Sequence, residues 1–197
     1  MYSEIPHLST PSKLVSDIIS EGPYILYVGR LAPNKGIDLL IRAYHRISSK
    51  TFDIKLVLAG QDAGMKDEIT RLLHDLDLEG KVFLTGFIEQ NDLHWLYRSA
   101  MFFCSPSTYG EAQNMTAAQA LAYGKPTIVS DTGGMGDFYR NIEGAIVVRK
   151  GQLEDLAAAM AYLIDNHNKI KIKQKTKVLY TWEEVAKETE HLYEELM

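Results

Sequence analysis

Six short apolar runs, each separated from the next by a segment with helical spacing, constrain the fold of this chain more than any other feature of its sequence. The runs are rich in β-branched and aromatic residues, which is typical of buried strands. They lie at residues 24–29, 54–59, 82–85, 101–104, 127–130 and 145–148. Strands that alternate with helices are joined by parallel crossovers, and their continuous apolar character fits a sheet covered on both faces. We therefore predict an α/β fold with a doubly wound parallel sheet.

The length of 197 residues fits one domain that can bury its own core. Residues 1–21 are polar and rich in turn residues, so we predict an interdomain linker or lead-in there. Residues 22–197 then form a single Rossmann-like domain. Helices expected at 153–164 and 182–196 would close this domain, and the five lysines of residues 169–177 are interpreted as a solvated helix face.

Charge and cysteine content exclude several classes of protein. With 26 acidic against 21 basic residues, the chain lacks the excess of positive charge that a nucleic-acid-binding protein uses against phosphates. Cys104 is the one cysteine, so no internal disulfide can form, and a cytoplasmic location is expected. No apolar run approaches the ~20 residues that a membrane span needs, so no transmembrane segment is expected. The six histidines have no metal-ligand spacing, and no metal is expected.

Two basic residues stand in the loop that follows the first predicted strand. Arg30 and Lys35 lie between Gly29 and Gly36, directly before an amphipathic helix. A helix N-terminus favours anions, and two cations beside it strengthen that preference. Pro-Asn-x-Gly is also ordinary turn chemistry, so a plain surface loop is the alternative.

A second polar loop follows the fourth predicted strand. Glu111 precedes a predicted helix start, and Asn114 is a plausible N-cap for that helix. Gln119 follows two helical turns after Glu111, on the same side as Met115. An ordinary loop acid and a satisfied polar group at a helix edge are the alternatives for Glu111 and Gln119.

Six motifs, each weak alone, occur in one order along the chain. They are Gly-Arg-Leu-x-x-x-Lys-Gly at 29–36, the strand end at 56–60, Thr-Gly-Phe-Ile at 85–88, Pro-Ser at 106–107 ahead of Glu111, Ala-Leu-Ala-Tyr-Gly-Lys-Pro at 120–126, and Ser-Asp-Thr-Gly-Gly at 130–134. In this order they resemble the C-terminal, donor-binding half of retaining glycosyltransferases with the GT-B architecture. The resemblance is greatest to glycosyltransferase family 4 (group 1) and extends from about residue 23 to residue 197.

The resemblance implies a donor site for a nucleotide-diphosphate sugar. Arg30 and Lys35, beside Gly29, would bind the diphosphate of a UDP or GDP sugar, and their charge would replace a divalent metal, so no cofactor is required. Charge-assisted contacts of this kind stabilise the leaving diphosphate. The base would be bordered, mainly through backbone contacts, by Gly86, Phe87 and Ile88.

The family's Glu-x7-Glu motif falls on Glu111 and position 119. Glu111 would lie against the donor sugar as a catalytic residue, together with Arg30 and Lys35. Position 119 would accept hydrogen bonds from the ribose hydroxyls, but Gln119 stands there, and it accepts without the negative charge. Residues 112–115 also depart from the family's Gly-Phe-Gly-Leu, although the backbone N–H groups of Asn114 and Met115 can still face the sugar phosphate.

The resemblance also implies a partner. In this architecture an N-terminal domain, in the same full-length chain or in a separate subunit, binds the acceptor, and it can make the protein peripheral at a membrane. Without that domain the chain has no positioned acceptor and no dry site, so we expect the isolated domain to be inactive. A non-catalytic nucleotide- or sugar-binding module is the alternative, followed by an epimerase or a phosphorylase on the same fold.

Overall fold

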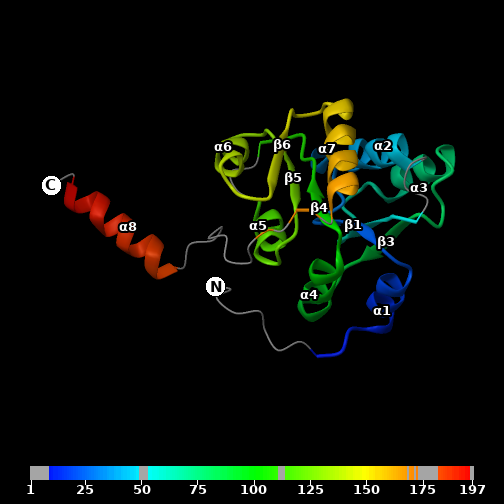
Figure 1. Cartoon of the computed structure of the whole chain (residues 1–197), viewed down its shortest axis with the longest axis horizontal. Helices are drawn as coiled ribbons and strands as arrows, with labels where there is room; N and C mark the ends of the chain where they lie inside the picture. Colours follow the sequence, from blue (N-terminus) through cyan, green and yellow to red (C-terminus); the bar gives the residue numbers. More distant parts are fainter. Residues whose placement is uncertain are drawn as a thin grey trace.

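A computed structural model describes residues 9–48, 53–110, 114–167, 169–170, 172 and 182–195 of the chain. Its centre is a six-stranded sheet with the order β3-β2-β1-β4-β5-β6, in which all neighbouring strands are parallel (Figure 1). The strands are β1 (Tyr24–Val28), β2 (Lys55–Ala59), β3 (Val82–Gly86), β4 (Phe102–Ser105), β5 (Thr127–Ser130) and β6 (Ala145–Val148). The strand order reverses between β1 and β4, so the predicted doubly wound sheet is confirmed.

The position of each strand in the sheet explains its exposure. All residues of β1, β4 and β5 are buried, because these strands lie inside the sheet and helices cover both of their faces. The outer strand β3 alternates between buried or half-buried and more exposed residues, and Leu84 in its middle is 37% exposed. The continuous apolar runs in the sequence therefore mark the central strands most clearly.

Helices form one layer on each side of the sheet (Figure 1). The helical elements are α1 (Lys13–Ser20), the 3₁₀-helix η1 (Pro33–Lys35), α2 (Ile37–Ser48), α3 (Lys66–Asp75), α4 (Gln90–Ser99), α5 (Met115–Ala122), α6 (Gly134–Arg140), α7 (Leu153–Asn166) and α8 (Trp182–Glu195). One core lies between the sheet and α2, α3 and α7, and it includes Ile25 and Leu58. The other lies between the sheet and α1, α4, α5 and α6, and it includes Leu26 and Val57. Alternate residues of β1 and β2 thus supply opposite cores, as the strand period requires.

The segment expected as a lead-in contains the helix α1, where the polar residues of the sequence suggested turns. Ser12 caps α1, because its hydroxyl accepts a hydrogen bond from the Val15 N–H (3.4 Å), and its own N–H donates to the Asp92 carboxylate on α4 (2.9 Å). Val15 and Ile18 are buried in the second core. The spacing of Val15 and Ile18 places both side chains on the face of α1 that packs in this core.

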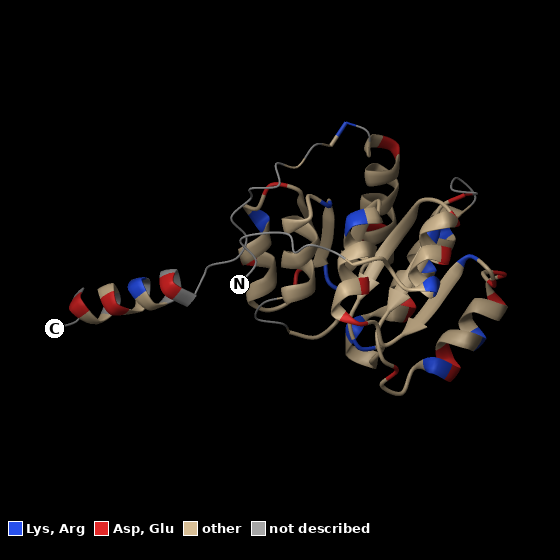
Figure 2. Cartoon of the chain, turned by 90° about the horizontal axis from the view of Figure 1, so that it is seen from below, with Lys and Arg blue, Asp and Glu red and all other residues tan. Residues whose placement is uncertain are grey.

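The two C-terminal helices differ in their packing. The prediction that both would close the domain is correct for α7, which packs on α2 and on the strands β5 and β6. It is wrong for α8, which lies apart from the sheet (Figures 1 and 2). Six of the 14 residues of α8 are glutamate, and such a helix has little surface to bury. Most of the lysine-rich segment 169–177 lies outside the described residues.

Among the helices of the described residues, none combines the length and the apolar content of a membrane span.

Candidate functional site

Two loops from opposite halves of the sheet meet where the strand order reverses. The Thr108 N–H, after β4, donates to the Asn34 carbonyl in η1 (3.0 Å). Gly36 ends η1 in the left-handed conformation (φ 68°), and a Cβ atom there would lie less than 3.0 Å from the Pro106 carbonyl oxygen. We call Asn34, Gly36, Pro106 and Thr108 the loop clasp. The clasp places the basic loop after β1 beside the polar loop after β4.

The structure holds the basic loop on the carboxyl end of β1. The Gly29 N–H donates to the Ala59 carbonyl (2.9 Å), and the Tyr27 hydroxyl donates to the Arg30 carbonyl (3.0 Å). The Arg30 side chain is exposed, whereas Lys35 is half-buried at the end of η1, next to the start of α2. The two predicted cations therefore lie at one edge of the sheet, beside the N-terminus of a twelve-residue helix.

The predicted base-bordering segment lies on the same edge, at the end of β3. The Gly60 N–H donates to the Gly86 carbonyl (2.9 Å), and this bond ties the ends of β2 and β3 together. Phe87 is 70% exposed, whereas Ile88 is buried in the core beneath α4. Strand β2 lies between β3 and β1, so two strand spacings, about 10 Å, separate the ends of β3 and β1.

Asn114 is the N-cap of α5, which confirms the prediction from sequence. Its side-chain oxygen accepts hydrogen bonds from the Ala117 N–H (3.1 Å) and from the Thr116 hydroxyl (2.7 Å). Its backbone is extended (φ −103°, ψ 97°), as a cap requires. The first member of the predicted carboxylate motif, Glu111, lies outside the described residues.

Two further residues hold Asn114, and neither contact was predicted from the sequence. The Asn114 side-chain amide donates to the Ser105 hydroxyl at the end of β4 (2.7 Å), and the Tyr139 hydroxyl of α6 donates to the Asn114 carbonyl (2.8 Å). All three residues are buried. Ser105 is nine residues from Asn114 in the sequence, whereas Tyr139 is 25 residues away, and the packing of α6 brings it there.

Met115 and Gln119 lie away from the core face of α5. Met115 is 50% exposed, and Gln119 is half-buried one turn further along. The buried residues of this helix are Ala117, Ala118, Ala120 and Leu121. The expected common side of Met115 and Gln119 is therefore confirmed, although the structure assigns neither of them a role.

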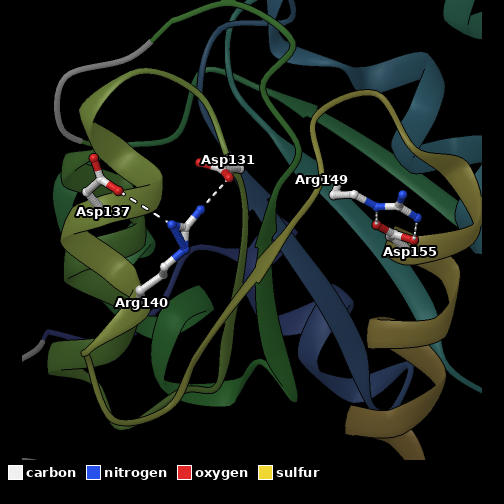
Figure 3. Close-up of polar contacts among 5 residues, drawn as sticks. All are labelled: Asp131, Asp137, Arg140, Arg149 and Asp155. Carbon is white, nitrogen blue, oxygen red and sulfur yellow. Dashed lines mark hydrogen bonds and ion pairs between the residues drawn. The ribbon is translucent and has the colours of Figure 1, made fainter.

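Ion pairs hold the loops after β5 and β6 (Figure 3). Arg140 of α6 contacts the carboxylates of Asp131 and Asp137, and the hydrogen bond to Asp131 raises the pKa of the guanidinium. Arg149 binds Asp155 through two hydrogen bonds of 2.5 and 2.8 Å, and these lower the pKa of the Asp155 carboxyl. Each of these guanidiniums is thus engaged with carboxylates of its own loop region.

No group of three His, Cys, Asp or Glu side chains in the described part of the chain has an arrangement that could hold a metal ion.

Fold and site together define a class of protein: a parallel Rossmann-like sheet, of the kind found in GT-B glycosyltransferases, with basic and polar loops at its topological switch point. Residues 12–177 match the family model described as glycosyl transferases group 1, and the chain belongs to this family. An uncharacterized glycosyltransferase of Methanocaldococcus jannaschii is 33% identical over 179 residues, which cover 86% of this chain and 44% of the relative. A lipopolysaccharide 1,2-N-acetylglucosaminetransferase of Salmonella typhimurium is 28% identical, over 88% of this chain and 49% of that enzyme.

Solved structures agree on the fold. Sucrose-phosphate synthase from Thermosynechococcus elongatus superimposes with a TM-score of 0.75 and 25% identity, over 98% of this chain and 52% of that one. Anabaena HepE, solved in complex with UDP, gives a TM-score of 0.77 at 21% identity, over 93% of this chain and 54% of that one. The chain thus spans about half the length, or less, of the relatives and structures that it matches here.

Proposed function

We propose that this chain is the donor-binding half of a retaining glycosyltransferase of family 4 and corresponds to the C-terminal domain of a GT-B enzyme. It would bind a nucleotide-diphosphate hexose, with uridine or guanosine as the nucleoside. A second, N-terminal type of domain would bind the acceptor. Membership of the glycosyl transferases group 1 family supports the reaction class. The match to about half of each relative supports the proposal that donor and acceptor are bound by different domains.

In the proposed reaction, the bond between the sugar C1 atom and the diphosphate oxygen breaks, and its electron pair stays on the diphosphate. Arg30 and Lys35 would hold the charge that develops there, without a metal. Glu111 would lie against the sugar, and Gln119 would accept hydrogen bonds from the ribose. The acceptor oxygen would then attack C1 from the side that the diphosphate leaves, and its proton would pass to the departing diphosphate oxygen, so that the configuration is retained.

The loop clasp is the observation that carries this proposal. It fixes Lys35 next to the loop that leads from β4 to α5, although the two loops are far apart in the sequence. A diphosphate beside Lys35 would therefore also be near the N-terminus of α5. Ligands of open parallel sheets bind at such a reversal of strand order.

Calorimetric titration tests the donor site. UDP, GDP, ADP and their sugar conjugates are titrated into the chain, with and without magnesium. We expect one nucleoside diphosphate to bind without metal, and Arg30→Ala and Lys35→Ala each to weaken it by about 10- to 100-fold, because a charge-assisted contact is worth ~1.5–3 kcal/mol.

Arg71→Ala is the matched control, because Arg71 is an exposed cation on α3 and its loss changes the net charge equally. All variants should keep the unfolding temperature of the wild type within a few degrees. Equal affinity in the wild type and in the Arg30 and Lys35 variants would refute the donor site, as would the absence of binding by every nucleotide.

A transfer assay separates the enzyme from a binding module. We expect the chain alone to bind the donor without transferring the sugar, because an open site admits water and positions no acceptor. Efficient transfer by the chain alone would contradict the proposed division into halves. The replacement of the family's second Glu by Gln119 favours the non-catalytic module as the second candidate, and that candidate predicts no transfer even after an acceptor-binding half is added.

A further inference from the structure

We propose that Tyr139 is a positioning residue for the donor diphosphate: its hydroxyl sets the direction in which the first peptide of α5 presents its N–H group. The inference rests on the proposed function, because it concerns the phosphate that the donor site would hold. Tyr139 lies on α6, outside the six sequence motifs described above.

The peptide that joins Asn114 to Met115 is held at its carbonyl end. The Asn114 carbonyl accepts two hydrogen bonds, from the Tyr139 hydroxyl (2.8 Å) and from the Ala118 N–H (3.1 Å). A peptide unit is planar and trans, so its carbonyl and its N–H point in opposite directions. Holding the Asn114 carbonyl therefore also fixes the direction of the Met115 N–H.

The Met115 N–H lies in the first turn of α5, where N–H groups have no acceptor within the helix. The Asn114 side chain already satisfies the Ala117 N–H (3.1 Å). The N–H groups of Met115 and Thr116 are thus those that α5 can offer to a phosphate oxygen, in addition to the positive end of its dipole.

A second set of bonds prevents the cap from turning. The Asn114 amide donates to the Ser105 hydroxyl (2.7 Å), which anchors it to β4. Asn114 is 7% exposed and Tyr139 is fully buried, so water does not compete well for these bonds. Strand β4 and helix α6 therefore hold the N-terminus of α5 from two sides.

Tyr44 provides a matched control for Tyr139. The Tyr44 hydroxyl is also buried and also donates to a backbone carbonyl, that of Ile54 (2.6 Å), but it lies at the start of β2, at the opposite edge of the sheet. Tyr139→Phe and Tyr44→Phe each remove one hydroxyl and one such bond. Both should lower the unfolding temperature, and only Tyr139→Phe should alter the donor site.

The test is calorimetric titration of the two variants and the wild type with UDP and GDP. For Tyr139→Phe we expect affinity for the bound diphosphate to fall about five- to tenfold, a part of what a complete charge-assisted contact supplies. Tyr44→Phe should bind as the wild type does. In amide NMR spectra, the Met115 N–H should shift when the nucleotide binds to the wild type, and the shift should be smaller in Tyr139→Phe.

Ser105→Ala provides a second test that leaves Tyr139 intact, and it should weaken nucleotide binding in the same direction. If Tyr139→Phe binds as tightly as Tyr44→Phe and keeps the full Met115 shift, the positioning role is refuted while the donor site stands. If the wild type binds no nucleoside diphosphate, the donor site itself is refuted, and the positioning role falls with it.

Discussion

Replacing Gly36 by alanine tests whether the loop clasp depends on the absence of a side chain. Gly36 has a φ of 68°, a left-handed conformation that costs an L-residue about 1–2 kcal/mol. The new Cβ atom would also lie less than 3.0 Å from the Pro106 carbonyl oxygen, which is backbone and cannot rotate away. Overpacking of this kind costs ~1–3 kcal/mol, so we expect a total loss of about 2–5 kcal/mol in the free energy of unfolding.

Gly80→Ala separates the two contributions. Gly80 has nearly the same φ, 74°, but a Cβ atom there would meet nothing within 4 Å. This control should therefore lose only the ~1–2 kcal/mol of backbone strain. The difference between the two variants measures the clash with Pro106.

Urea unfolding followed by circular dichroism gives both free energies, and titration with the nucleotide that the wild type binds gives the effect on the site. To relieve the clash with Pro106, the loop after β1 would have to move away from the loop after β4, and Lys35 would move with it. Gly36→Ala should therefore also bind the nucleotide more weakly than Gly80→Ala does. If the two variants lose the same free energy, the clasp is not a tight contact, and our reasoning about how Lys35 is placed is wrong.

Two further predictions concern individual ionisable groups. The exposed pair of His74 and Glu79 (2.9 Å) raises the pKa of the histidine and lowers that of the carboxyl. The histidine's contribution to stability is lost as the pH rises through its raised pKa, and the carboxyl's as the pH falls through its lowered pKa. NMR titration should therefore find the His74 pKa above its usual value in the wild type and near it in Glu79→Gln; equal values would contradict the pair. Burial raises the pKa of the Cys104 thiol, so a thiol reagent should label the chain only after unfolding in urea, and rapid labelling of the native chain would disprove this.

The strands were predictable because central parallel strands are buried on both faces, and burial leaves a continuous apolar run. The predicted bounds of the last two strands are those of β5 and β6, and the others differ by one or two residues. The helix α1 was missed because Pro11 and the polar residues before it suggested a turn, although Ser12 and the spacing of Val15 and Ile18 carry a short helix signal.

Only those features of the candidate site that lie within one loop were predictable from the sequence. The Asn114 cap follows from a residue type ahead of a helix, which is local information. The contact of Gly36 with Pro106 and that of Tyr139 with Asn114 join distant parts of the chain. Such contacts depend on how α2 and α6 pack on the sheet, and no pattern within one loop encodes that packing.

The sheet has two halves, β3-β2-β1 and β4-β5-β6, and the seam between them, where β1 pairs with β4, is short. Strand β1 pairs with β2 along its whole length, Tyr24–Val28, but with β4 only at Ile25 and Leu26. Strands β1 and β4 are far apart in the sequence, so their pairing closes a long loop of chain. During folding this pairing therefore costs more conformational entropy than a contact between neighbouring segments does. The clasp lies at the open end of the seam, so each half of the sheet, folded by itself, would carry only one of the two loops that we propose to bind the diphosphate. A nucleotide that needs both would bind only the completed fold, and its binding would stabilise the contact between the two halves.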